Sequence, residues 1–297
     1  MKRRAAEAAT CWGVYRETEH SPHREADDAG ILEATGRRLE AEGFTVAYRT
    51  PGSVNGGDGA LPTLAFSMCE GIPALEILSR WERRGVCVVN GARAVKQTHR
   101  ERTIPLLEGR RIPMPESLVV DCAGALPAGA EADRLFSACW VKQATGHKTR
   151  EGDVLFAADR AALAQALSRL RERGLPRAVV QRHVDGDLVK FYGVADPVAA
   201  AGETDLPPAW FKWFYPKEHP VAGHPFGTRA LCDIACAAAA ALDLEVWGGD
   251  AIVTPAGEIL VIDINAWPSF ALFRDEAAEH IAAHLAARVR RLARVAV

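Results

Sequence analysis

The chain carries the sequence GEILVIDINAWPSF at residues 257–270. After Gly257 and Glu258, this stretch has four consecutive apolar residues, 259–262, which are typical of a buried strand. It then places Asp263 and Asn265 where a continuing buried strand would carry hydrophobic side chains. Burying a carboxylate costs free energy unless a cation or hydrogen-bond donors replace the lost water. The end of this strand is therefore a candidate functional site.

A second strand comes directly before this one. It has the sequence EVWGGDAIV, residues 245–253, and a short Pro-Ala-Gly turn joins the two strands into a predicted hairpin. If Thr254 faces Gly257 across the turn, the same pairing places Asp250 opposite Val261. The two strands then run antiparallel, with their polar residues at the end far from the turn.

The polar side chains of the hairpin form a candidate metal site. Asp250, Asp263 and Asn265 share one face under this pairing, because side chains two apart on a strand point the same way and diagonal neighbours lie about 7–8 Å apart. They offer hard oxygen ligands without sulfur or imidazole, which predicts Mg²⁺ or Mn²⁺ rather than Zn²⁺. Gly248 and Gly249 beside them leave room for a phosphate to approach the backbone.

Length and composition describe an ordinary globular protein. The chain has 297 residues, of which 48% are hydrophobic and 25% are charged, and its formal net charge is −2. This near-neutral charge argues against a nucleic-acid-binding surface. The seven cysteines contain no CxxC pair, which favours reduced core thiols. The sequence contains no run of eighteen apolar residues, the length that a membrane-spanning helix requires. We therefore expect a cytoplasmic protein.

The order of predicted elements indicates more than one lobe. Residues 11–89 alternate strands with amphipathic helices, which indicates a parallel sheet with crossover helices. The following part favours antiparallel strands with one covering helix, an α+β arrangement. A Gly/Pro/Ala-rich stretch near 118–130 provides a boundary. We predict an N-terminal α/β lobe, a small α+β lobe and a metal-binding lobe at residues 10–120, 121–190 and 191–297.

The motifs together resemble the ATP-grasp superfamily. The segment LEVWGGDAIV followed by ILVIDIN is similar to the family's metal-binding end, where an acid on one strand and an acid-x-Asn on the next hold magnesium against ATP. LEVWGGD resembles ribosomal-protein glutamate ligases, while VIDIN with the following aromatic residue and Pro268 resembles inositol trisphosphate kinases. The likeness covers residues 85–270. It implies a three-lobed ATP-grasp fold with ATP and Mg²⁺ bound between the second and third lobes.

The resemblance also implies roles for single residues. SACWVKQ resembles the strand that bears an ATP lysine, here Lys142, and ATGHKTREGD resembles the flap over the phosphates, with Lys148. In KQTHRERTIPLL, Arg100 and Arg102 fit a basic ATP contact equally well. AVVQRHVDGDLVKFYGV resembles the adenine hinge and the basic strand that follows it. The residues implied there are Gln181, Arg182, His183 and Val184 for the hinge, Asp187 for the ribose, and Lys190 for the phosphates.

Catalysis is expected from Lys190 and from Arg229, which begins an Ala-rich helix and faces either the acceptor or solvent. The resemblance implies ATP-dependent ligation of a carboxylate to an amine through an acyl phosphate. The alternatives are a small-molecule kinase similar to inositol phosphate kinases, and a module that binds ATP without turnover. We expect a small-molecule or peptide substrate, and the sequence leaves the oligomeric state open.

Overall fold

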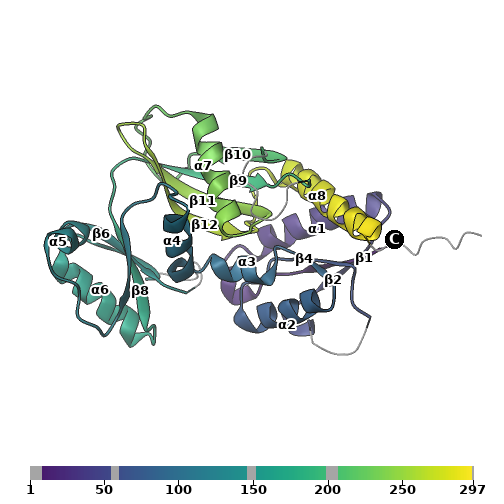
Figure 1. The fold of residues 1–297 in the computed structure, drawn as a ribbon, viewed down its shortest axis with the longest axis horizontal. Coiled ribbons are helices and arrows are strands. Elements are labelled where there is room, and N and C mark those ends of the chain that lie inside the picture. The colour runs from purple at the N-terminus through teal and green to yellow at the C-terminus, as the bar shows by residue number, and fades with distance from the viewer. Residues whose placement is uncertain (1–8, 55–59, 146–151, 199–206, 296–297) are drawn as a thin grey trace, which may run out of the picture.

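The structure is a computed structural model that describes residues 9–54, 60–145, 152–198 and 207–295. It contains three four-stranded sheets, and helices cover each of them (Figure 1). The flap residue Lys148 lies outside the described residues. No helix in the described part of the chain combines the length and the apolar character that crossing a bilayer requires.

The first sheet is parallel throughout, as predicted. Its strand order is β2-β1-β3-β4, with β1 at Thr10–Val14, β2 at Thr45–Arg49, β3 at Leu64–Ser67 and β4 at Cys87–Val89. The helices α1 (Glu25–Ala41) and α2 (Ile72–Arg83) lie on opposite faces. Along β3, Leu64 and Phe66 join the core that contains α1, whereas Ala65 joins the core that contains α2.

The second sheet is antiparallel and forms the small lobe. Its order is β5-β8-β6-β7, with β5 at Ser117–Asp121, β6 at Cys139–Gln143, β7 at Val154–Ala157 and β8 at Arg177–Arg182. Two helices, α5 (Ala130–Phe136) and α6 (Arg160–Glu172), pack on it around a separate core. The Asp159 carboxylate caps α6 by accepting the Ala162 N–H at 2.8 Å.

The third sheet carries the predicted hairpin. Its order is β10-β9-β11-β12, with β9 at Asp187–Val194, β10 at Trp210–Phe214, β11 at Val246–Val253 and β12 at Ile259–Ala266. The Ala-rich helix α7 (Thr228–Ala241) packs on one face of this sheet. The last helix, α8 (Arg274–Val295), returns to pack against α1 of the first lobe.

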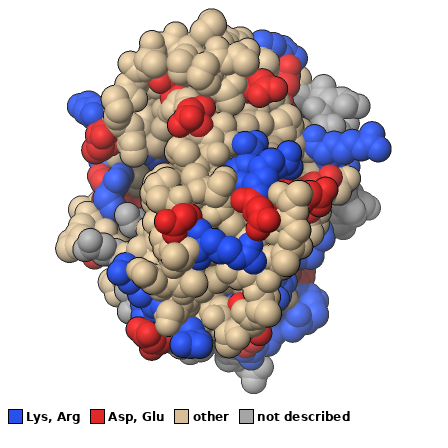
Figure 2. All heavy atoms as spheres, turned by 90° about the vertical axis from the view of Figure 1, so that its left-hand side faces the viewer, with Lys and Arg blue, Asp and Glu red and all other residues tan. Residues whose placement is uncertain are grey.

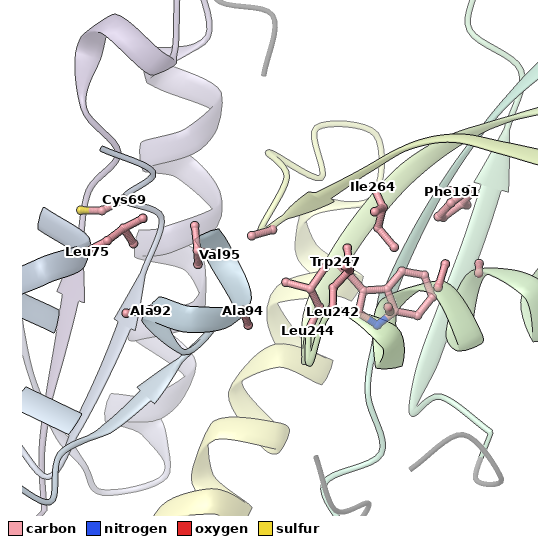
Figure 3. Close-up of a cluster of buried hydrophobic side chains, with 14 of the residues drawn as sticks. Cys69, Leu75, Ala92, Ala94, Val95, Phe191, Leu242, Leu244, Trp247 and Ile264 are labelled. Atoms are coloured by element: carbon pink, nitrogen blue, oxygen red, sulfur yellow. The ribbon is translucent and has the colours of Figure 1, made fainter. Parts of the chain in front are cut away.

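A continuous hydrophobic core joins the first and third sheets. Helix α3 (Ala92–Gln97) supplies Ala92 and Val95 between Leu75 on α2 and Trp247 on β11 (Figure 3). Helix α4 (Arg100–Gly109) follows and adds Leu107 to the same core. The chain passes from the first sheet to the second between β4 and β5, and from the second to the third between β8 and β9.

The division into three lobes remains a prediction. The points where the chain passes from one sheet to the next can be compared with its boundaries. The predicted boundaries at 120/121 and 190/191 fall inside β5 and β9. Each of these strands nevertheless belongs wholly to one sheet, β5 to the second and β9 to the third. Division by sheet membership therefore places the boundaries a few residues earlier than predicted.

Candidate active site

The hairpin register differs from the prediction at two places. The Thr254 N–H donates to the Glu258 carbonyl at 2.9 Å, so three residues form the turn and Gly257 adopts a φ of +81°, which suits glycine. Further along, Ala251 pairs with Val261 whereas Asp250 pairs with Asp263, which leaves Ile262 as the extra residue of a β-bulge. The predicted pairing of Asp250 with Val261 is therefore wrong.

The corrected register brings the metal candidates closer together than predicted. Asp250 lies directly opposite Asp263, and Gly248 lies opposite Asn265, so all three polar side chains occur on one face. Direct cross-strand neighbours have Cβ atoms about 4.5–5.5 Å apart. The predicted space for a phosphate beside Gly248 is filled, because a Cβ there would lie 2.8 Å from Pro268 and 2.9 Å from Tyr192.

The two faces of the third sheet have different roles. Alternate residues such as Val189 and Phe191 are fully buried in the core that contains α7. Residues that point to the opposite face of the sheet, including Leu188 on β9 and Asp250 on β11, face the second sheet across a cleft of about 410 Å³. A volume in this range is typical of small-molecule and cofactor sites. Its walls include the apolar side chains of Pro115, Val154, Leu188, Ile252 and Ile262.

Each of the two hairpin carboxylates in the cleft is paired with a basic side chain from another element. The Lys190 Nζ donates to both oxygens of Asp250 at 2.8 and 2.9 Å. The Arg100 guanidinium contacts Asp263 at 2.8 Å, and its side chain is only 7% exposed. Arg102 on the same helix is exposed to solvent, so the structure places Arg100 and not Arg102 at the cleft.

Lys142 is a buried cation at the centre of the cleft. Its Nζ donates to Gln181 Oε1 at 2.8 Å and to the Ile262 carbonyl at 3.1 Å. Burial lowers the pKa of Lys142 to about 8, partly offset by the nearby Asp263 carboxylate. Burial disfavours the charged form of Lys142, and an anionic group bound beside it would favour that form again. Lys142 is therefore suited to contact an anionic ligand.

The predicted hinge residues line the same cleft. Arg182 and His183 are fixed by main-chain N–H bonds to Glu116 and Ala138 at 2.8 and 2.9 Å. The main-chain N–H and C=O of Val184, by contrast, have no hydrogen-bond partner among the described residues. One donor and one acceptor are thus available at the cleft wall.

Two predicted site residues do not face the cleft. The Asp187 carboxylate accepts three main-chain N–H groups of residues 222–224 and is 2% exposed. Its predicted ribose contact is not supported, because Asp187 points to the other face of β9. Arg229 lies on α7, the helix that covers the face of the sheet opposite the acids. Its side chain is 81% exposed and pairs with Asp233 one turn later. Of the two predicted orientations of Arg229, the structure shows the one toward solvent, and a catalytic role is not supported.

The residues present fit a divalent metal ion. The Asn265 Oδ1 atom is buried without a hydrogen-bond partner in the described structure, which is costly unless a ligand satisfies it. Among the described residues no group of three or more His, Cys, Asp or Glu side chains could hold a metal. Two carboxylates and one amide oxygen leave further positions for phosphate or water, as Mg²⁺ usually requires.

Besides the apolar wall residues and Gly186, sequence reasoning missed three cleft-lining residues whose side chains can hydrogen-bond, namely Trp140, Asp185 and His219. Trp140 could have been found, because it lies two residues before Lys142 on β6 and must point the same way. His219 lies in the loop between β10 and α7, where no periodic pattern applies.

On the face of the molecule in Figure 2, acidic and basic side chains are mixed, in keeping with the near-neutral net charge.

Comparison with known proteins gives structural matches only. No protein-family model and no curated protein sequence matches the chain. D-alanine–D-alanine ligase from Bacillus anthracis complexed with ATP matches with a TM-score of 0.69 and 13% identity, covering 98% of this chain and 100% of that one. The RimK domain ATP-grasp protein from Sphaerobacter thermophilus gives 0.65 and 15%, covering 93% and 99%.

A third similar structure is the ATP-grasp ligase PsnB complexed with precursor peptide PsnA2 and AMPPNP. Its TM-score is 0.62 at 17% identity, and the match covers 97% of this chain and 100% of that one. These matches extend over almost the whole of each chain and include all three sheets. The chain therefore has the fold of the ATP-grasp superfamily.

Proposed function

We propose that the chain is an ATP-dependent, ADP-forming ligase that joins a carboxylate to an amine through an acyl phosphate. The observation that carries the proposal is the convergence of two carboxylates, one orphaned amide oxygen and three cations beside one cleft. Transfer of a phosphoryl group depends mainly on positioning and charge compensation, and this set supplies both.

The nucleotide is proposed to lie with adenine at the hinge. The N–H and C=O of Val184 offer the donor and the acceptor that the edge of adenine requires, and Leu188 and Ile252 provide apolar walls for the ring. From there the cleft leads to Lys142 and Arg100, which would meet the phosphates. A charge-assisted hydrogen bond of this kind contributes about 1.5–3 kcal/mol.

The metal site of the proposal consists of Asp250, Asp263 and Asn265. These oxygens would hold Mg²⁺ or Mn²⁺, which supplies charge neutralisation for the phosphates when bound. Lys190 touches Asp250 in the structure, so it would lie within reach of the phosphates of a nucleotide bound at this metal. We assign Lys190 to stabilising the negative charge of the phosphoryl group during transfer.

The reaction balances as two displacements. A carboxylate oxygen of the first substrate attacks the γ-phosphorus of ATP, the bond to the bridging oxygen breaks, and ADP leaves. The amine nitrogen of the second substrate then attacks the acyl carbon, loses a proton, and releases inorganic phosphate. The second and third sheets, which form the cleft, must exclude water between the two steps, because water would hydrolyse the acyl phosphate.

Product analysis across carboxylate, amine and polyol substrates tests the proposal, with small molecules and peptides in the panel. We expect ADP and free phosphate in equal amounts only when a carboxylate and an amine are both present. Asp263→Asn should abolish this release, and Arg229→Ala, which changes a charge outside the cleft, is the matched control. ADP with no free phosphate and a product heavier by one phosphoryl group would replace the ligase with a kinase. Binding of ATP without any turnover would indicate an ATP-binding module.

A further inference from the structure

Two cysteines lie one turn apart on α7, the helix that covers the third sheet on the face away from the cleft. Cys232 and Cys236 are four positions apart, so their side chains point to the same side of the helix with Cβ atoms about 5–6 Å apart. Both residues are half-buried, and both cysteines are free. A small species in solvent can therefore reach two neighbouring thiols.

The two thiols contact each other. The side chains of Cys232 and Cys236 are hydrogen-bonded, and this bond lowers the pKa of Cys232 against the opposing effect of burial. The same bond, together with burial, raises the pKa of Cys236. On the same side of the helix, Arg229 Nε pairs with Asp233 Oδ1 at 2.8 Å, so these two charges largely cancel. The pair thus offers one thiol that loses its proton readily beside a second sulfur.

The other cysteines of the chain are placed differently. Burial is the main cause of a raised pKa at each of them, namely Cys11, Cys69, Cys87, Cys122 and Cys139. Cys11 on β1 and Cys87 on β4 both pair with Leu64 of β3, which puts two strand spacings, or about 10 Å, between them. This separation is too large for one ion to contact both sulfurs. Helix α7 therefore presents the two thiols best placed to share an ion.

The spacing of the two side chains decides what they can hold. A disulfide requires a bond of about 2.05 Å between the sulfurs and Cβ atoms about 3.5–4.5 Å apart. This is closer than one regular helical turn allows, so a disulfide would distort α7. A metal ion holds each thiolate at about 2.3 Å, so the two sulfurs can lie up to about 4.6 Å apart. The regular turn thus suits two thiolates with an ion between them.

The ligand set favours a soft ion. Within the described parts of the chain, no cluster of three or more His, Cys, Asp or Glu side chains could bind a metal, so α7 offers two sulfurs and no third ligand of these kinds. Structural Zn²⁺ requires four ligands, and Mg²⁺ and Ca²⁺ require oxygen. Thiolates select soft ions such as Cu(I), which is stable with two ligands.

We propose that Cys232 and Cys236 form a binding site for one soft, thiophilic ion of the Cu(I) class, held between two thiolates on α7. Binding forms two metal–sulfur bonds and releases both thiol protons to solvent. No electron is transferred, and the bound group carries one negative charge. Because α7 lies on the far side of the third sheet from the cleft, the proposal does not depend on the proposed function.

Anaerobic titration of the full, reduced chain with Cu(I), against a competing coloured chelator, tests the site. The wild-type protein should bind one Cu(I) tightly, and two thiols should become protected from a thiol reagent. Cys232→Ala and Cys236→Ala should each weaken binding by more than about a hundredfold, since loss of a direct ligand exceeds the 10–100-fold cost of losing an outer contact. Cys87→Ala is the matched control, because it removes another half-buried cysteine, and it should leave the affinity unchanged.

Two further measurements separate binding from folding. Cu(I) should raise the Tm of the wild-type protein and of Cys87→Ala, but not that of the two α7 variants. Its binding should leave the helix content measured by circular dichroism unchanged, because the ion fits the regular turn. Cys236 packs partly against the core, so Cys236→Ser provides a second variant if Cys236→Ala lowers the Tm of the metal-free protein.

Three results would overturn the proposal. The first is wild-type affinity for Cu(I) in either α7 variant. The second is an equal loss of affinity in Cys87→Ala, which would show that Cu(I) binds to scattered thiols. The third is a Cys232–Cys236 disulfide that forms readily with glutathione disulfide in a protein whose reduced form does not bind Cu(I), which would replace the ion site with a redox pair.

Discussion

Replacing Lys142 with methionine should make the protein more stable while weakening its affinity for nucleotide. Lys142 is 7% exposed, and burial lowers its pKa from the ordinary 10.5 to about 8. A depressed lysine pKa means that the folded protein holds this charge at a cost. Methionine has a similar length and no charge, so Lys142→Met removes that cost with little change in packing.

The size of the effect follows from two opposing terms. A fall in pKa from 10.5 to about 8, at about 1.4 kcal/mol per pKa unit, corresponds to a cost of about 3.5 kcal/mol. Against this, Gln181 Oε1 and the Ile262 carbonyl lose the lysine as a donor, at roughly 1 kcal/mol each. The net expectation at pH 7 is a gain of about 1–2 kcal/mol, which for a chain of 297 residues corresponds to a rise in Tm of about 2–3 °C.

The pH dependence has a definite sign. Between pH 8 and about 10.4 the unfolded chain keeps a proton on Lys142 that the folded chain has lost, so the stability of the wild-type protein rises with pH in this window. The cost is fully present below pH 8. The advantage of Lys142→Met over the wild-type protein should therefore be largest near pH 7 and shrink toward pH 10.

Thermal denaturation of both proteins between pH 7 and 10, with and without ATP and Mg²⁺, measures these effects. At the same ATP concentration, ATP should raise the Tm of the wild-type protein clearly more than that of Lys142→Met. Lys142→Arg is a control for charge, because arginine remains protonated throughout this range. A Lys142→Met protein that is less stable than wild type by a margin independent of pH would refute the reasoning.

Three other substitutions have expected outcomes. Asp263→Asn should abolish turnover and lower the free energy of unfolding by about 2–4 kcal/mol, since it leaves Arg100 buried beside a neutral group; equal denaturation midpoints would contradict this. Lys190→Ala should weaken Mg²⁺-dependent ATP binding by about 1–3 kcal/mol in calorimetry, and unchanged affinity would remove Lys190 from the site. Arg229→Ala should leave turnover unchanged and stability within about 0.5 kcal/mol, whereas a large loss of turnover would restore its catalytic role.

Much of the fold could be predicted from local sequence patterns. The parallel sheet follows from strands that alternate with amphipathic helices, and all four strands occur where the pattern placed them. The metal hairpin was found because four apolar residues run directly into Asp263. These features depend on residues adjacent in the chain, which a sequence displays directly.

The exact register of the hairpin was less accessible. The three-residue turn shifts the pairing by one position, and the bulge at Ile262 shifts it by one more. A total shift of two moves the partner of Asp250 from Val261 to Asp263 but keeps it on the same face, because the side-chain period of a strand is two. The predicted convergence on one face was therefore correct in its result, although the predicted pairing was wrong.

The placements of Asp187 and Arg229 could not be derived from the sequence for a different reason. Each depends on which face of the third sheet is covered by α7, and this is decided by packing between distant segments. The loop of residues 216–227 provides the N–H groups that use the Asp187 carboxylate, and it lies about 35 residues later in the chain. A motif identifies an acid near the hinge, but it does not say which way the acid points.

The pairing of Asp250 with Asp263 explains why cations from separate elements meet in this cleft. Two carboxylates directly opposite each other in a sheet destabilise it. Lys190 from β9 and Arg100 from α4 compensate for this repulsion through their ion pairs with Asp250 and Asp263. In the proposed function the same cations would contact the phosphates, and the carboxylates would hold the metal. Each of these four charges would then have a partner before and after binding, so the cleft could exclude water without leaving an isolated charge.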